Sequence, residues 1–236
     1  MLSYPGIRHL LWFAPFFVIV SLALYFFSIS GFVAQLHNGQ GIWNFASDAF
    51  GDHVFAGFLA DRLREGDYSG WWALPVHSNP AYVKIYSVFY YLLGKSPLSL
   101  IPLNSAVYLI VVLMTFFVGK ALFSESVGFW SAVLVGMMPS FFLQATQSAK
   151  DSISIGALLL ILNAVILFLK ENQTKRSISI IVANALIGSW ILWLFRLYML
   201  QIVSFLWFCV LVRSVVRGLR RKGKYGMAIG VGAILL

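Results

Sequence analysis

The sequence predicts an all-α membrane protein: a polytopic bundle of transmembrane helices with amphipathic juxtamembrane helices in its first outer loop. Of its 236 residues, 60% are hydrophobic and only 11% are charged, and the mean hydropathy is +0.86. Soluble domains carry roughly 25% charged residues. The apolar residues also form runs long enough to cross a hydrocarbon core of ~30 Å. A single transmembrane domain over residues 1–236 is therefore expected.

Several apolar runs are long enough to be transmembrane helices. The predicted spans are residues 10–33, 101–119, 127–145, 152–169, 177–195 and 197–212. A last apolar run begins at Tyr225 and stops at Leu236. At ~1.5 Å per residue this run is too short to cross a bilayer. We therefore expect the chain to be an amino-terminal portion of a longer protein, truncated at its carboxyl end.

The net charge of +9 does not indicate a nucleic-acid partner. The basic residues sit in short clusters between apolar runs, as in the cytoplasmic loops of bilayer proteins. No nucleic-acid-binding motif accompanies them. The single cysteine, Cys209, lies in an apolar run, so neither a disulfide nor a thiolate metal site is predicted.

Residues 34–100 are predicted to form the first outer loop. The loop holds most of the acidic residues of the chain: Asp48, Asp52, Asp61, Glu65 and Asp67. Within it, Val54–Leu63 has an amphipathic pattern that predicts a helix on the membrane surface. Its apolar face is expected to contain Phe55, Phe58, Leu59 and Leu63. Trp71 and Trp72 would lie at headgroup depth, and Asp61, Glu65 and Asp67 would form a solvated face.

Residues 80–93 decide the topology, because this run is short for a span and contains Lys84. If the amino terminus is cytoplasmic and this run does not cross, 11 of the 17 basic residues are cytoplasmic. They are Arg8, Lys120, Lys170, Lys175, Arg176, Arg213, Arg217, Arg220, Arg221, Lys222 and Lys224. If the run crosses, only four are: Arg8, Lys95, Lys150 and Arg196. The positive-inside rule favours the first arrangement, with 80–93 as a re-entrant or surface helix.

This topology brings Asp52, Asp151 and Arg196 to one side of the membrane. Asp52 has two readings, a helix cap or a general base or metal ligand. Asp151 is likewise either a cap or an acid that faces Asp52, with Lys150 binding an anion. Arg196 either reaches lipid headgroups or clamps a substrate phosphate.

Four segments resemble the GT-C superfamily of integral-membrane glycosyltransferases, in its protein O-mannosyltransferase and aminoarabinose transferase branch. The first is the G-D-x3-A-x3-A-x2-L-x2-G pattern of Gly51–Gly66. Asn79-Pro80 opens the second, an aromatic segment that ends in LLGKSP at Pro97. The third comprises VGKALF (118–123) and SVGFWSAVLVGMMPS (126–140), and the fourth is Lys150-Asp151 at the start of a helix.

The resemblance implies a polyprenyl-phosphate-linked sugar as donor and a glycan, lipid or protein of the cell envelope as acceptor. It implies that Asp52, or Asp48 one helical turn earlier, is the catalytic acid of the first outer loop. Lys150, Arg196 and Lys84 would bind the substrate phosphate. A divalent metal ion, Mg²⁺ or Mn²⁺, would lie between Asp52 and Asp151. The implied location is the bacterial inner membrane.

A different class of function stays open from the sequence alone. The chain could be a transporter of polyprenyl-linked glycans or a non-catalytic subunit of a membrane assembly. A transporter is expected to place ionisable residues near the bilayer midplane, usually beside broken helices. Here the charged residues lie at the ends of the apolar runs, which favours chemistry at the membrane surface.

Overall fold

The computed structural model describes residues 5–45, 47–73, 80–147, 149–169 and 175–222, and these residues fold almost entirely into helices. No strand occurs among them, and the only β-type pairing is an isolated bridge between His37 and Trp43. The α-helices are α1 (Pro5–Leu10), α2 (Phe13–Ile29), α3 (Ser47–Arg64), α4 (Tyr68–Ala73), α5 (Pro80–Leu93), α6 (Ile101–Leu122), α7 (Glu125–Met137), α8 (Pro139–Gln147), α9 (Ala149–Leu169), α10 (Lys175–Phe195) and α11 (Leu197–Lys222). Short 3-10 helices, η1 (Ala34–Leu36) and η2 (Pro97–Leu100), precede α3 and α6. The predicted all-α fold class is confirmed.

Four helical stretches in the described part of the chain are long and apolar enough to cross a membrane. They are Gly6–Ile29, Pro97–Leu122, Lys150–Leu169 and Ser177–Phe195. These match four of the predicted spans. The apolar part of α11, Tyr198–Arg213, is shorter. The predicted run from Tyr225 lies outside the described residues.

The predicted span 127–145 is not one straight helix. It is divided into α7 and α8, which meet at an angle of 58° and are together long and apolar enough to cross a membrane. Met138 is extended, with ψ of 113°, as is usual before a proline, and Pro139 has no N–H to continue the ladder. The break frees the carbonyl of Gly136, which instead accepts a hydrogen bond from the buried hydroxyl of Tyr108.

Close approach of helix backbones holds the spans together. In α6 and α7, Gly119 and Gly128 face each other, and a Cβ on Gly128 would lie 2.5 Å from the carbonyl oxygen of Phe116. In α9 and α10, a Cβ on Gly188 would lie 2.8 Å from the carbonyl oxygen of Ala157. Small residues commonly allow such contacts between transmembrane helices, where burial against lipid gives little driving force.

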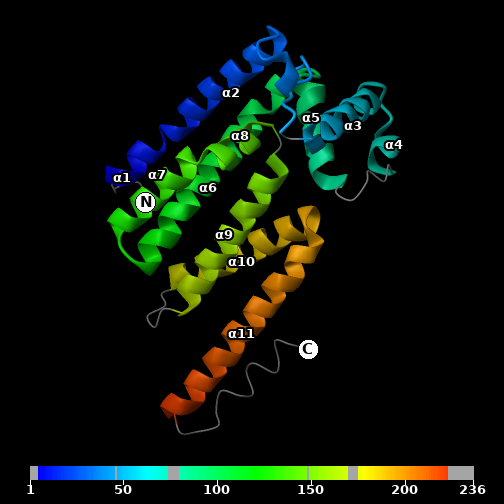
Figure 1. The fold of residues 1–236 in the computed structure, drawn as a ribbon. Helices are drawn as coiled ribbons and strands as arrows, with labels where there is room; N and C mark the ends of the chain where they lie inside the picture. The colour runs from blue at the N-terminus through cyan, green and yellow to red at the C-terminus, as the bar shows by residue number, and fades with distance from the viewer. Residues whose placement is uncertain (1–4, 46, 74–79, 148, 170–174, 223–236) are drawn as a thin grey trace.

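Helices α3, α4 and α5 form a separate layer at one end of the bundle (Figure 1). With 14 residues, α5 reaches about 21 Å, which is too short for a span, and it packs on α3. The predicted apolar face of α3 is only partly buried within the protein. The buried face contains Ala56, Leu59 and Ala60, whereas Phe55 and Phe58 are exposed. The small side chains at 56 and 60 let α5 approach closely, so they face the protein and leave the larger rings outside.

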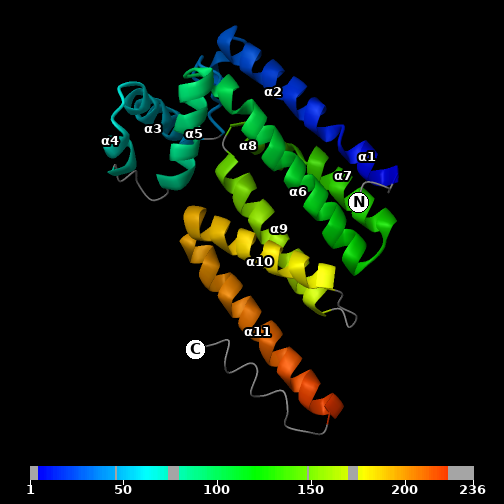
Figure 2. The same ribbon diagram turned by 180° about the vertical axis from the view of Figure 1, so that it is seen from behind.

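The two ends of the bundle carry different elements, as the front and back views show (Figures 1 and 2). One end gathers the α3–α5 layer, the end of α8, the start of α9 and the turn between α10 and α11. The opposite end carries α1, the α6–α7 turn, the end of α9 and the start of α10. Phe195 at the end of α10 belongs to the same buried cluster as Tyr82 and Leu59, which fixes the layer onto the spans.

Candidate functional site

The candidate site lies where α3, α5, α9 and α11 meet, at the end of the bundle that carries the α3–α5 layer. Asp48 and Asp52 lie one turn apart on α3, so their side chains project from the same face. Asp48 is in the first turn of the helix, where the positive end of the helix dipole favours an acidic side chain. Lys150 and Asp151 belong to the first turn of α9.

Lys150 is shared between the two carboxylates of α3. Its Nζ lies 2.8 Å from Oδ2 of Asp48 and 3.6 Å from Oδ2 of Asp52. The Lys150 side chain is only 12% exposed, and its ammonium also lies 5.5 Å from the ring centre of Tyr82. The hydrogen bond from Lys150, followed by its charge, lowers the pKa of Asp48 below its usual range.

Asp52 is in a very different environment from Asp48. Its side chain is 13% exposed, compared with 72% for Asp48. Oδ1 of Asp52 accepts a hydrogen bond from the hydroxyl of Tyr82, while Oδ2 is buried and accepts no hydrogen bond from the described residues. Burial raises the pKa of Asp52 above its usual range, and it outweighs the opposing effects of Tyr82 and Lys150. A carboxylate whose pKa is moved towards neutrality is suited to accept a proton.

Asp151 forms the second half of the cluster. It pairs with the guanidinium of Arg196, and its Oδ2 accepts a hydrogen bond of 3.0 Å from the side-chain amide of Gln144. Arg196 also donates to the hydroxyl of Tyr198, at 3.1 Å. Because Arg196 stands between α10 and α11, this ion pair fastens their turn to the start of α9.

The structure thus brings together five of the six residues singled out from the sequence: Asp48, Asp52, Lys150, Asp151 and Arg196. The sixth, Lys84, lies with α4 instead. Its Nζ donates to the carbonyl oxygen of Trp72 at 2.7 Å and stands over the rings of Trp71 and Trp72. The chemical roles of all six residues stay predictions.

The predicted divalent-metal site would use the carboxylates of Asp52 and Asp151, and that of Asp151 is already paired with Arg196 and Gln144. Among the residues that the structure describes, no three His, Cys, Asp or Glu side chains converge to hold an ion. Oδ2 of Asp52, which accepts no hydrogen bond from the described residues, is nevertheless a hard oxygen donor, the type that Mg²⁺ prefers. Mg²⁺ is often held by one or two carboxylates together with substrate phosphates. The donor set therefore fits a metal that arrives with its substrate.

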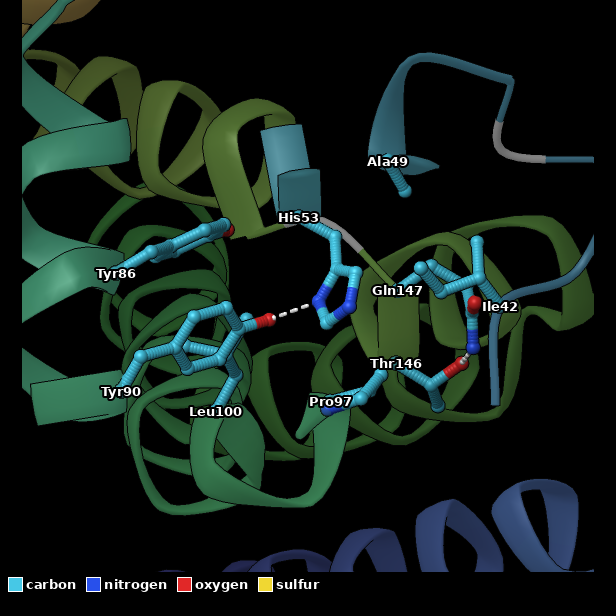
Figure 3. A pocket seen from close by; sticks show the side chains of 9 residues that line it. All are labelled: Ile42, Ala49, His53, Tyr86, Tyr90, Pro97, Leu100, Thr146 and Gln147. Carbon is cyan, nitrogen blue, oxygen red and sulfur yellow. Dashed lines mark hydrogen bonds between the residues drawn. The ribbon is translucent and has the colours of Figure 1, made fainter. Parts of the chain in front are cut away.

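His53 lies on the other side of the α3–α5 contact, in a small pocket (Figure 3). Its Nδ1 is 2.7 Å from the hydroxyl oxygen of Tyr90, and Thr146 and Gln147 line the opposite wall. The space is about 10 Å³, the room that one water molecule needs, so no sugar fits there. Burial lowers the pKa of His53, which keeps the ring neutral near pH 7.

A row of buried tyrosines is the main feature of the site that the sequence analysis missed. Tyr82, Tyr86 and Tyr90 occupy positions i, i+4 and i+8 of α5, and all three are buried. Tyr82 holds Asp52, and Tyr90 pairs with His53. Their four-residue spacing is visible in the sequence and indicates one helical face. Gln144 had no comparable signal, because its role depends on the bend between α7 and α8.

No protein-family model matches the chain, and no curated protein or solved structure matches it at a significant level. The resemblance to GT-C glycosyltransferases therefore depends on the sequence segments described above and on nothing else.

Proposed function

We propose that the chain is a GT-C-like glycosyltransferase, or the amino-terminal membrane module of one. It would transfer a sugar from a polyprenyl-phosphate carrier to a cell-envelope acceptor. The observation that carries the proposal is the cluster at the end of the bundle. There, a buried carboxylate of raised pKa lies beside Lys150, and Lys150 is followed in the chain by the Asp151–Arg196 pair. A proton acceptor and two cations in one cluster are groups that can assist transfer from a lipid phosphate.

In the proposed reaction, Asp52 accepts the proton of an acceptor hydroxyl as that oxygen attacks the anomeric carbon of the sugar. The bond between this carbon and the phosphate oxygen breaks, and the polyprenyl phosphate leaves with the bonding electrons. Lys150 and Arg196 stabilise the negative charge that develops on the leaving group. Asp52 is preferred over Asp48 as the base, because Asp48 is exposed and its pKa is lowered by Lys150.

The charge of the cluster supports a metal in this proposal. Asp48, Asp52 and Asp151 contribute −3 when ionised, and Lys150 and Arg196 contribute +2, which leaves −1 before the substrate binds. A phosphodiester adds a further negative charge. When bound, Mg²⁺ or Mn²⁺ would offset this excess and polarise the phosphate oxygens. Asp52 and Asp151 are the residues that would hold it.

We also propose that the cluster faces the non-cytoplasmic side of a bacterial inner membrane, with the amino terminus in the cytoplasm. Helix α1, which contains Arg8, and the α6–α7 turn, which follows Lys120 in α6, lie at the end of the bundle opposite the α3–α5 layer (Figure 1). An excess of basic residues marks the cytoplasmic side. The lipid-linked donor would then reach the site from the outer leaflet.

The test is release of polyprenyl phosphate by the full chain in lipid nanodiscs. The substrates are a synthetic polyprenyl-phosphate sugar with a radiolabelled sugar and an extract of cell-envelope acceptors. Wild type is expected to move label onto the acceptor. Asp52→Asn should lower the rate by about 10²- to 10⁴-fold, the usual contribution of a general base. Equal rates for wild type and Asp52→Asn would remove Asp52 from this role.

The bend between α7 and α8 is the one observation that favours the transporter alternative, because transporters often contain broken helices. At this break, however, the freed carbonyl of Gly136 is already paired with Tyr108, and Phe141 and Phe142 pack against Tyr108. An apolar, filled break offers no polar site for a glycan. Movement of labelled lipid across proteoliposomes without release of polyprenyl phosphate would support the transporter instead.

A further inference from the structure

Asp48 and Asp52 both pair with the ammonium group of Lys150, but the protein restrains their side chains to different degrees. Asp52 is fixed by the Tyr82 hydroxyl and is largely buried. The Asp48 side chain is 72% exposed, and Lys150 is its only hydrogen-bond partner among the described residues. Of the two carboxylates, Asp48 is the one that can separate from Lys150 at little cost in free energy, because water solvates the exposed carboxylate when the ion pair breaks.

Lys150, unlike Asp48, is largely buried. Its side chain is 12% exposed, and its charge is compensated by Asp48 at 2.8 Å and Asp52 at 3.6 Å. An ammonium group that is mostly removed from water is costly without a nearby anion. Lys150 will therefore exchange one anion for another more readily than it will give up Asp48 without replacement. Of the two carboxylates that the structure places on Lys150, Asp48 is the one that faces solvent.

We propose that Asp48 is a displaceable carboxylate that covers Lys150 until a phosphate group on a lipid takes its place. The carboxylate oxygen marks the position that a phosphate oxygen would adopt, since both accept charge-assisted hydrogen bonds from an ammonium at about 2.7–2.9 Å. Oδ2 of Asp52 is buried and lies 3.6 Å from the same ammonium, yet it accepts no hydrogen bond from the described residues, which is a second indication that a ligand completes the arrangement. This inference rests on the proposed function, because it describes how that site admits its phosphate substrate.

Displacement of Asp48 has two consequences for the site. It removes one negative charge from beside the incoming phosphate, so the repulsion between enzyme and substrate falls at the moment of binding. It also leaves Asp52 as the carboxylate nearest to the occupied Lys150. In the absence of substrate, Asp48 competes with every anion for Lys150, which makes the site selective for ligands that gain further binding energy from a lipid tail.

The experiment measures binding without transfer. The full chain in lipid nanodiscs is titrated by calorimetry with a short, water-soluble isoprenyl phosphate, with the matching isoprenol and with inorganic phosphate. Asp48→Asn should bind the isoprenyl phosphate about fivefold more tightly than wild type, the gain expected when an exposed ion pair of ordinary strength no longer competes. The gain should shrink at high salt.

Matched variants separate competition from general charge effects. Glu65→Gln removes one exposed acid just after α3 and should leave the affinity unchanged. Asp48→Glu should restore wild-type affinity, and in a Lys150→Gln background the Asp48→Asn gain should disappear. If Asp48→Asn does not fold, Asp48→Ser makes the same comparison.

Several outcomes would overturn the inference. Unchanged or weaker binding by Asp48→Asn would show that Asp48 does not compete. Equal binding of isoprenol would show that phosphate is not recognised, and equal binding of inorganic phosphate would remove the lipid from the assignment. Because no sugar transfer is measured, the result is separate from the proposed function. An Asp48→Asn gain without any transferase activity would support the phosphate site and count against the glycosyltransferase.

Discussion

The hydroxyl of Tyr82 donates a hydrogen bond to Oδ1 of Asp52, and this contact joins α5 to α3 within the candidate site. Burial raises the pKa of Tyr82, so the hydroxyl keeps its proton and acts as a donor. A donor stabilises the ionised form of a carboxylate. Tyr82 therefore opposes the burial that raises the pKa of Asp52.

Tyr82→Phe is expected to raise the pKa of Asp52 further and to move the acid limb of the activity profile to higher pH. It should also lower the free energy of unfolding by about 1.5–3 kcal/mol, the usual contribution of a hydrogen bond to a charged group. The loss should be larger above the pKa of Asp52 than below it, because the ionised form benefits most from the donor. Thermal unfolding in detergent across a pH series measures this.

Tyr91→Phe is the control for Tyr82→Phe, because Tyr91 is an exposed tyrosine on the same helix. It should change neither the stability nor the pH profile. If both variants behave alike, the Tyr82 contact does not tune Asp52.

Asp52→Asn should increase thermal stability at neutral pH while it abolishes transfer. The folded-state pKa of Asp52 is raised, so the folded state binds a proton more readily than the unfolded state. Stability is then lost as pH rises through the raised pKa. The amide of Asn at position 52 has no charge to desolvate, so the variant does not lose stability as the pH rises. The prediction is checked by melting temperatures from pH 4 to pH 8, where the variant should show a flatter profile than wild type.

Matched stability profiles for Asp52→Asn and wild type would contradict the raised pKa, even if activity were lost. Asp67→Asn gives a useful contrast. Hydrogen bonding to the backbone N–H of Gly70 and to the side chains of Arg62 and Ser69 lowers the pKa of Asp67. Asp67→Asn should therefore lower the free energy of unfolding at pH values above the usual carboxyl pKa, and it should have little effect at pH values below the lowered pKa of Asp67.

The sequence was sufficient for the all-α fold and for four of the spans, because long apolar runs have few alternatives in a bilayer. It also identified five residues that the structure brings together, because positive-inside topology places loops that are far apart in sequence on one side. The partners within the site were harder to predict. Lys150 contacts residues 98 and 102 positions earlier in the chain, and no local pattern encodes such a pairing.

Two details of packing could not be derived from the sequence. The sequence predicted an apolar, membrane-facing side of α3 with Phe55, Phe58 and Leu59; Phe55 and Phe58 are exposed, whereas Leu59 is buried together with Ala56 and Ala60. Hydrophobicity alone ranks phenylalanine above alanine, whereas close helix packing selects small side chains. Lys84 was expected to bind phosphate, a role that stays a prediction, and its ammonium lies over the indole rings of Trp71 and Trp72. Such cation–π contacts depend on where α4 lies relative to α5, and no pattern in the sequence predicts this placement.

Lys150→Met is expected to weaken binding of an isoprenyl phosphate by at least tenfold, and Lys84→Met is expected to have no effect on it. Lys150 also pairs with Asp52, whose side chain is as buried as its own, and loss of a partner from a buried ion pair costs about 3–5 kcal/mol, so Lys150→Met should also lower the melting temperature. Lys150→Arg separates the two effects, since it keeps the charge and should keep most of the stability. Weaker binding by Lys84→Met, with Lys150→Met unaffected, would reverse the assignment of the two lysines.

Gly128→Ala should destabilise the α6–α7 pair by about 1–3 kcal/mol, the usual cost of overpacking. The added Cβ would lie 2.5 Å from Phe116 O and 2.7 Å from Lys120 N, and backbone atoms cannot move aside as a flexible side chain can. Gly51→Ala is the matched control, because a Cβ on Gly51 in α3 meets nothing within 4 Å. The control should be neutral or should stabilise α3 by about 0.5–1 kcal/mol. Chemical denaturation in micelles compares the two variants.

Opposite ends of the bundle are expected to react with a membrane-impermeant maleimide from opposite sides of the membrane. Cys209 is the only cysteine of the chain and is exposed, so a Cys209→Ser background is free of thiols. In that background, Glu65→Cys marks the α3–α5 end, and Ser126→Cys marks the first turn of α7 at the other end; both positions are exposed. In intact cells whose outer membrane has been permeabilised, Glu65→Cys should be labelled and Ser126→Cys should react only after lysis. The reverse pattern would place the Asp52 cluster in the cytoplasm, where a donor in the outer leaflet would not reach it, and labelling of both positions in intact cells would mean that α6 does not cross the membrane.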